Sequence, residues 1–307
     1  AAATAFPWIP RQPAMGRIRC RPCRPGKQLT AAAPCCALVA FTRRERKRVS
    51  RQCGDSPTFD TKFLVYIEDT DCFGVVFYAN YFRFFQRALN ELHDLQGKEN
   101  RAVIVGVTQA RYRSAAKLGD VLTVQLWLEE DAQHHQRWKV RSVAEVECVS
   151  AELLVVHAAQ DFLSSRKWPA FAGQPRATLV PAREECASPP SIHDVLRWFE
   201  RSRSDFLGGP KALQQVMDLG ILVVVARIDD FEYDTKLVYL GSDAVDWEVR
   251  SVLDISRGKL IFDERLIMQP NSDYEVAIAR ANVTCVCIDA TTRRITRAPK
   301  KLLELIK

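Results

Sequence analysis

The sequence predicts an α+β fold made of two copies of one unit, in which an antiparallel sheet wraps a long helix. Two segments have the apolar spacing of a helix, and each is followed by segments in which apolar and polar residues alternate. The motif Arg-x-Phe-x-Arg of residues 83–87 also recurs at residues 197–201, 114 positions later. A repeat of this period indicates two related domains in one chain.

Each predicted helix has an apolar stripe. In the first helix the stripe consists of Phe82, Phe85, Leu89 and Leu92. In the second helix it consists of Leu196, Phe199 and Phe206. Ser191 is a candidate N-cap for the second helix, and Gly208-Gly209-Pro210 is expected to end it.

Strands are expected after each helix. In the first copy, alternating residues predict strands within 122–128, 138–148 and 153–162. In the second copy they predict strands within 245–249, 260–268 and 277–288. This alternation places one face of a sheet against a core and the other in water.

These patterns divide the chain into five parts. They are a targeting or disordered basic leader (1–57), a first domain (58–165), a linker (166–176), a second domain (177–298) and a C-terminal tail (299–307). The linker is recognised by Pro169, Gly173 and Pro175, residue types that interrupt regular structure.

The net charge of +7 originates in the leader. Residues 1–55 hold 12 Lys/Arg and two acidic residues, whereas the remainder holds 32 and 35. A nucleic-acid-binding body is therefore not supported. The Arg-rich, acid-poor leader is typical of an organellar transit peptide, and we expect a plastid rather than a mitochondrion; a basic tail is the alternative. No apolar run is long enough for a membrane-spanning helix.

The cysteines do not indicate a metal site. Five of the ten lie within residues 1–55. Cys20 and Cys23 have the spacing of half a zinc site, but no second pair and no His cluster follows at zinc-finger spacing. We expect no metal and no other cofactor.

The most informative segment runs from Asp69 to Tyr81, directly into the first helix. It places Asp71 in a loop and Gly74 between this carboxylate and the helix. A helix N-terminus supplies backbone N–H groups without intrahelical partners and a partial positive charge. Acyl-transfer hydrolysis needs a base or nucleophile beside such an oxyanion site. The alternative is that Asp71 only caps the turn or the helix.

The ordered string in this segment resembles a known family. The string consists of Asp71, Gly74, Phe77, Tyr78, Asn80 and Tyr81. It resembles the active-site segment of hot-dog-fold acyl-CoA thioesterases of the 4-hydroxybenzoyl-CoA thioesterase (YbgC-like) type. The resemblance is dense over residues 66–92 and becomes a general pattern over 102–162.

The resemblance implies a thioesterase that acts on acyl-CoA or on an acyl carrier protein (acyl-ACP). It implies that Asp71 attacks the thioester carbonyl or activates water, and that the backbone N–H of Tyr78 polarises the carbonyl oxygen. Gly74 is expected to allow close backbone approach and a positive φ. Asp69 is interpreted as a solvated loop acid, with restraint of the loop as the alternative, and His93 is interpreted as a surface residue.

Four further residues of the segment are candidate substrate-binding residues by the same resemblance. They are Val76, Phe77, Asn80 and Tyr81. For Asn80 and Tyr81 the alternative is that they only fix the start of the helix.

The resemblance also implies that two hot-dog domains pair into one continuous sheet, with active sites at the seam between them. A chain with two copies forms this dimer internally. Association of such chains into a larger homo-oligomer is left open.

The second copy departs from the motif. Glu185 stands at the position of Asp71, Ser188 replaces Gly74, and Pro189 and Pro190 follow. Since proline lacks an N–H donor, we expect this copy to be a degenerate partner of the first. Glu185 is kept as a second-copy candidate because it is an acid at the position of Asp71. Some related enzymes place the key Glu on the central helix instead, which makes Glu91 and Glu200 candidates, with an exposed helix acid as the alternative for each.

Two rival functions remain. A hot-dog dehydratase usually pairs a His with an acid, and His193 with an acid from the other half is the pair available here. The second rival is a non-catalytic acyl-binding or scaffold protein.

Overall fold

A computed structural model describes residues 57–98, 100–132, 135–157, 170–179, 190–234, 247–268 and 276–305. All of these residues belong to one unit of the chain, residues 46–307. Apart from Pro57, the predicted leader lies outside the described residues, and so does the second-copy candidate Glu185.

The first copy contains one long helix and five strands. Its elements are β1 (Phe59–Leu64), η1 (Ile67–Asp69), α1 (Asn80–Leu95), β2 (Val103–Tyr112), β3 (Val121–Asp131), β4 (Gln136–Val143) and β5 (Glu147–Val156). The second copy continues as β6 (Arg176–Leu179), α2 (Ile192–Phe206), α3 (Gly209–Asp218), β7 (Ile221–Tyr233), β8 (Trp247–Ser256), β9 (Lys259–Met268), β10 (Val276–Asp289), β11 (Ile295–Thr296) and α5 (Lys300–Leu305).

The strands form one 11-stranded antiparallel sheet in the order β1-β3-β4-β5-β2-β7-β10-β9-β8-β6, with β11 beside β10. From edge to seam, the first copy runs β1-β3-β4-β5-β2 and the second runs β6-β8-β9-β10-β7. The two halves therefore have the same topology. At the seam β2 pairs with β7, from Gly106–Glu232 to Arg111–Arg227. The prediction of two units paired into one continuous sheet is confirmed.

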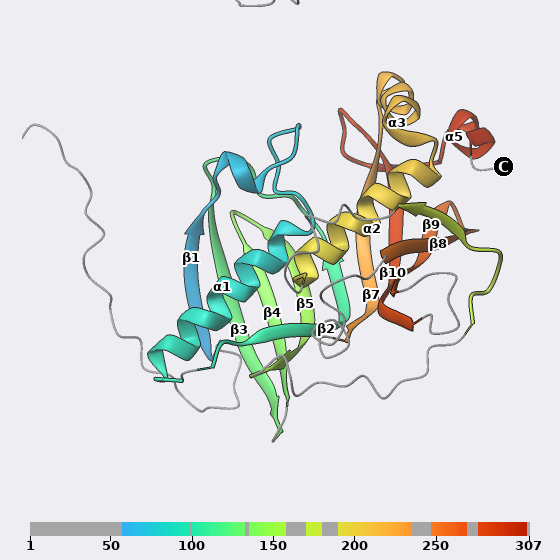
Figure 1. Cartoon of the computed structure of the whole chain (residues 1–307). Coiled ribbons are helices and arrows are strands. Elements are labelled where there is room, and N and C mark those ends of the chain that lie inside the picture. The colour runs from blue at the N-terminus through green and yellow to red at the C-terminus, as the bar shows by residue number, and fades with distance from the viewer. Residues whose placement is uncertain are drawn as a thin grey trace, which may run out of the picture. The chain divides into compact units, whose positions relative to one another are not determined.

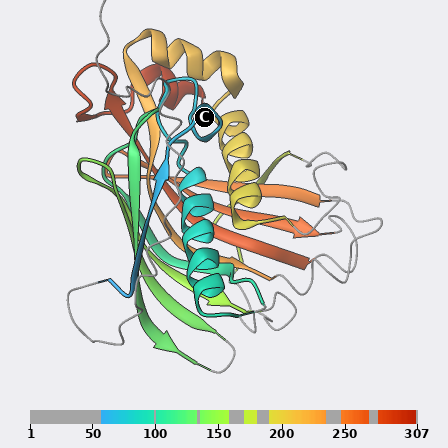
Figure 2. The ribbon, with the colours of Figure 1, turned by 90° about the vertical axis from the view of Figure 1, so that its left-hand side faces the viewer.

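Both long helices lie on one face of the sheet, α1 over the first half and α2 over the second (Figures 1 and 2). All four residues of the predicted stripe of α1 are fully buried. The stripe of α2 is buried as well, and one apolar cluster continues through both copies. The helical periodicity of the sequence therefore identified the packed faces.

Two details differ from the sequence expectations. The expected strand 138–148 is divided into β4 and β5 by a turn, in which the Ala144 N–H donates to the Val146 carbonyl and Val146 is 59% exposed. The turn contains no Gly or Pro, so the alternation of the sequence continues through it. Likewise, Gly208-Gly209-Pro210 ends α2 and also begins α3, because Pro in the first turn of a helix needs no N–H partner.

The end of the chain adds a short helix to the second copy. Residues 300–305, within the predicted tail, form α5, which contacts α3. Leu302 of α5 is fully buried. This segment is therefore packed against the second copy.

Gly106 lies where the two copies join. A Cβ at this position would lie 3.1 Å from the Leu154 Cβ and 3.4 Å from the Phe231 carbonyl oxygen.

We expect Gly106→Val to lower the free energy of unfolding by about 1–3 kcal/mol, since the packed seam must shift to admit the side chain. Urea denaturation measures this. Thr108→Val, at an exposed position of the same strand, is the control and should change it by less than about 0.5 kcal/mol. Equal stability of the two variants would contradict the close approach.

His93 was interpreted as a surface residue, and this interpretation is wrong. Its side chain is buried near the end of α1, 5.0 Å from the ring of His157. Its Nδ1 lies 3.2 Å from the Asn100 carbonyl, while Nε2 has no hydrogen-bond partner within the part of the chain described. Burial lowers the pKa of His93, and also that of His157.

Because the unfolded chain binds these protons at a higher pH than the folded chain does, acid should destabilise the fold. The ordinary pKa of His is 6.5, so the free energy of unfolding should fall as the pH drops below that value. Denaturation at about pH 7.5 and about pH 5.5 tests this. His93→Gln should reduce the loss, whereas His135→Gln, in the β3–β4 turn, should not. If wild type and His93→Gln lose equal free energy of unfolding between the two pH values, protonation of His93 does not cause the acid destabilisation.

Candidate active site

The loop between η1 and α1 folds back on itself. Thr70 pairs with Val76 in an antiparallel bridge. The Asp71 N–H donates to the Val75 carbonyl at 2.8 Å, and the Gly74 N–H donates to the Asp71 carbonyl at 3.0 Å. Gly74 has the expected positive φ, +70°, which glycine adopts without a steric penalty.

Asp71 is half-buried in this loop. Its Oδ1 accepts hydrogen bonds from the backbone N–H of Phe73 at 2.8 Å and of Val75 at 3.4 Å. Its Oδ2 accepts none from the residues that the structure describes. One oxygen is thus fixed by the turn, as in the capping alternative, while the other is available to water or to a substrate.

Asp69 was interpreted as a solvated loop acid, and the structure corrects this. The side chain is fully buried, and its Oδ2 accepts from the Tyr66 N–H at 3.0 Å. Its Oδ1 has no partner among the described residues. The Asp69 carbonyl accepts from the Phe77 N–H at 3.1 Å and from Nδ2 of Asn80 at 2.9 Å. Asp69 therefore connects the loop to the beginning of α1.

The beginning of α1 has backbone donors without acceptors. Within the described part of the chain, neither the N–H of Tyr78 nor that of Ala79 is hydrogen-bonded. Ala79 is the N-cap, and its side chain cannot accept a hydrogen bond. These two consecutive N–H groups can receive an oxyanion. That the N–H of Tyr78 polarises a thioester carbonyl, as the resemblance implies, stays a prediction.

The N-terminal ends of α1 and α2 meet at the centre of the sheet (Figure 1). Nε2 of His193 lies 2.6 Å from Oδ1 of Asn80, and the Tyr78 hydroxyl donates to the Leu196 carbonyl at 2.6 Å. Residues 113 and 118 positions apart are thereby joined. Both helices direct the positive ends of their dipoles to this place, which favours negative charge there.

Asp194 supplies one such charge. Its carboxylate accepts from the backbone and hydroxyl of Ser191 at 2.9 and 2.7 Å, and its Oδ1 lies 3.4 Å from Nδ1 of His193. Partial burial opposes ionisation, but these contacts outweigh it and hold the pKa of Asp194 well below its usual range. The predicted N-cap Ser191 is confirmed.

Among the candidate substrate-binding residues, Val76 and Tyr81 lie in the core, 4% and 1% exposed. The Tyr81 hydroxyl accepts from the Ala116 N–H at 2.9 Å. Asn80 is also buried and joins Asp69 to His193. Phe77 is half-buried, with its ring 4.7 Å from that of Tyr78. Of the four, Phe77 has the most accessible side chain.

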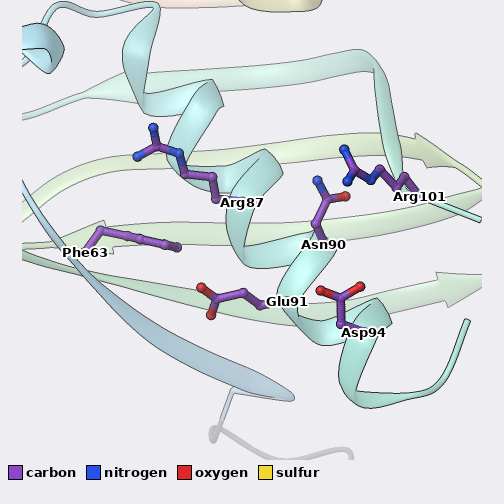
Figure 3. Close-up of a pocket in the computed structure, with 6 residues that line it drawn as sticks. All are labelled: Phe63, Arg87, Asn90, Glu91, Asp94 and Arg101. Atoms are coloured by element: carbon purple, nitrogen blue, oxygen red, sulfur yellow. The ribbon is translucent and has the colours of Figure 1, made fainter. Parts of the chain in front are cut away.

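The two helix glutamates differ in position: Glu200 contacts Arg203, which contacts Tyr78, whereas Glu91 lies elsewhere on α1. Oε2 of Glu200 is 2.7 Å from Nη2 of Arg203. Glu91 accepts from the Thr61 hydroxyl at 2.7 Å and lines a cavity of about 240 Å³. Figure 3 shows this cavity, lined by Phe63, Arg87, Asn90, Glu91, Asp94 and Arg101. The lining residues of α1 lie between its middle and its C-terminal end, at least seven residues or about 10 Å from Asn80. The cavity is separate from the Asp71 loop.

Sequence reasoning missed Arg203, which contacts the candidate site. Arg203 of α2 is 2% exposed, and its Nη2 donates to the Tyr78 hydroxyl at 2.6 Å. The repeat contains the signal that could have found it: by the same 114-residue shift, position 203 corresponds to Leu89. A charged residue at an apolar position of the stripe marks an exception to simple core packing.

The fold and the site can be compared with known proteins. Residues 73–149 match the family model of the thioesterase superfamily. The fold is a tandem hot dog. The matched segment runs from the loop into β5, so it contains Gly74, Tyr78 and Asn80 but begins two residues after Asp71. No curated protein matches the sequence significantly.

Solved structures support the fold over both copies. A putative oleoyl thioesterase from Lactobacillus plantarum is 7% identical, with 74% of this chain and 95% of that chain covered at a TM-score of 0.51. The 12:0-ACP thioesterase from Umbellularia californica is 10% identical, with 78% and 94% covered at a TM-score of 0.50. At these identities the similarity establishes the double hot-dog fold alone.

Two further observations concern the described residues. They contain no group of three or more His, Cys, Asp and Glu side chains placed to hold a metal ion. No helix among them has the length and apolarity needed to cross a bilayer.

Gly74 and Gly97 form a matched pair for a test of the loop. They have φ of +70° and +69°, and an added Cβ would meet no atom within 4 Å at either place. Gly74→Ala and Gly97→Ala should therefore cost similar stability, about 1–2 kcal/mol from backbone strain. Only Gly74→Ala should also reduce the turnover rate, roughly tenfold or more, because a small displacement of the reacting groups lowers the rate strongly. Equal turnover of the two variants would show that the loop is not part of a site.

Proposed function

We propose that this protein hydrolyses an acyl thioester carried by coenzyme A or by acyl carrier protein. One observation carries the proposal: among the described residues, a carboxylate with one fixed and one free oxygen lies in the loop that leads to two unpaired N–H groups at the start of α1. The match of residues 73–149 to the thioesterase superfamily supports it. So does the similarity in fold to a putative oleoyl thioesterase and to a 12:0-ACP thioesterase.

The chemistry requires two functions at the thioester carbonyl. Asp71 accepts a proton from water, and the water oxygen attacks the carbonyl carbon. The carbonyl oxygen gains negative charge, which the N–H groups of Tyr78 and Ala79 stabilise. When the C–S bond breaks, the departing thiolate takes the proton from Asp71. The products are the free acid and the carrier thiol.

The carrier is the finer part of the proposal. The Arg-rich, acid-poor segment 1–55 supports delivery to an organelle, a plastid in our interpretation. One structural neighbour acts on a 12:0-ACP. Both acyl-CoA and acyl-ACP, over a range of acyl groups, therefore belong in the assay.

Asp71→Asn tests the mechanism. It keeps the shape of the side chain but removes the base, so kcat should fall roughly 100-fold or more, about 3 kcal/mol of transition-state stabilisation. Asp289→Asn is a matched control, because Oδ1 of Asp289 accepts from the N–H groups of Thr291 and Thr292 in a similar turn at the end of β10. The control should hydrolyse at the wild-type rate. If Asp71→Asn does too, Asp71 is not the base, and if the wild type binds acyl thioesters without cleaving them, the protein is an acyl-binding one.

A second candidate, a dehydratase, is favoured by the contacts of His193. The acid beside His193 is Asp194 of its own helix, not an acid of the other half, and Nε2 is bonded to Asn80. Release of water from 3-hydroxyacyl thioesters, lost in His193→Gln, would support this function over hydrolysis.

A further inference from the structure

A buried ion pair of the second copy lies directly behind the candidate site of the first. Arg203 of α2 and Glu264 of β9 are joined through Nη1 and Oε2, and their side chains are 2% and 0% exposed. Removing two such charges from water is costly, and apolar residues of similar size often serve stability equally well. The pair therefore calls for a reason other than stability.

The first copy shows that helix packing does not require this arginine. Leu89 occupies the corresponding position of α1 and is fully buried. The neighbouring residues of the two helices are alike, including Phe85 and Phe199, both fully buried. The same fold thus accepts leucine at this place, and only the second copy has an arginine.

The guanidinium group of Arg203 contacts Tyr78 of the first copy as well as Glu200 of its own helix. Its Nη2 donates to Oε2 of Glu200 at 2.7 Å and to the Tyr78 hydroxyl at 2.6 Å. Its guanidinium carbon also lies 5.5 Å from the centre of the Tyr78 ring, a cation–π contact. Glu264 accepts a hydrogen bond from Nη1 and so fixes the orientation of the guanidinium group of Arg203.

The hydroxyl and the backbone carbonyl of Tyr78 are hydrogen-bonded, whereas its backbone N–H has no partner among the described residues. Its hydroxyl accepts from Arg203 and donates to the Leu196 carbonyl at 2.6 Å, and its own carbonyl accepts from the Tyr112 hydroxyl at 3.2 Å. Burial raises the pKa of Tyr78, which keeps the hydroxyl protonated for this donation. The remaining polar group is the N–H, unpaired within the described residues.

We infer that Arg203 and Glu264 are positioning residues, through which the second copy holds Tyr78 and thereby aims the free N–H at the start of α1. The inference rests on the proposed function, because the N–H is useful only if a carbonyl oxygen binds there. A donor that is already oriented stabilises the oxyanion without reorganisation at the moment of reaction. The second copy, although it lacks Gly74 and Tyr78, then contributes directly to the site of the first.

Kinetics of paired variants test this. Arg203→Leu alone leaves Glu264 buried and unpaired, so the informative protein is the full chain with both Arg203→Leu and Glu264→Leu. Its kcat should fall about 10- to 100-fold with KM changed less than about threefold, because a displaced donor weakens transition-state stabilisation. Arg265→Leu, on the same strand, is the control, since Asp263 keeps its contact with Arg280. It should retain wild-type kcat. A wild-type kcat in the double variant would overturn the inference.

A mutant cycle shows whether the pair acts through the hydroxyl. Tyr78→Phe removes the group that Arg203 and Leu196 hold but keeps the ring. In the Tyr78→Phe background, removal of Arg203 and Glu264 should reduce kcat less than about twofold further, because the connection is already broken. Losses that multiply independently would show that the pair contributes only general stability and would overturn the inference.

A measurement without substrate keeps this inference separate from the proposed function. The chain has seven tyrosines, so ¹⁵N-tyrosine labelling gives few amide signals, and the Tyr78→Phe protein identifies that of Tyr78. The Tyr78 amide should change in chemical shift and hydrogen exchange in the double variant but not in Arg265→Leu. An unchanged Tyr78 amide would refute the positioning role even if hydrolysis is confirmed. A changed amide without hydrolysis in the wild type would uphold the positioning and refute the proposed function.

Discussion

The pairing of β2 with β7 is the contact on which the other features of the site depend. Each copy alone would leave one of these strands with an unpaired edge, which favours association. Their antiparallel pairing joins the two half-sheets and places both long helices on one face. It also brings the starts of α1 and α2 together, so that Asn80 contacts His193 and Tyr78 contacts Leu196. The candidate site thus depends on the pairing of the two half-sheets.

Two positive helix ends at one place repel each other unless negative charge lies near them. The chain supplies acidic residues at this place: Asp194 is ionised well below its usual pKa, and the buried Asp69 connects η1 to the start of α1. The N–H groups of Tyr78 and Ala79, unpaired in the part of the chain that the structure describes, remain as further places for negative charge. A substrate oxyanion would therefore complete an electrostatic arrangement that the fold has already begun.

The sequence contained most of the architecture but only part of the site. Helix stripes and the 114-residue repeat predicted the two units, because periodicity reflects which face is buried. The burial of Asp69 and His93 could not be predicted, since short-range pattern does not show which loop or strand will cover a polar residue. The turn after Val143 was not predicted, because it contains no residue type that is typical of turns. The contacts of Arg203 and His193 with the first copy depend on register at the seam, which no local pattern encodes.

The difference between Leu89 and Arg203 has a consequence for how such a protein can be built. In a homodimer of a single unit, every position occurs twice, so a buried arginine and its glutamate would appear in both units, and so would the reacting groups. A fused chain encodes the two helices separately. One unit can then keep an apolar helix and carry the reacting groups, while the other accumulates polar supports. Gene fusion in this fold thus permits a division of labour that symmetry forbids.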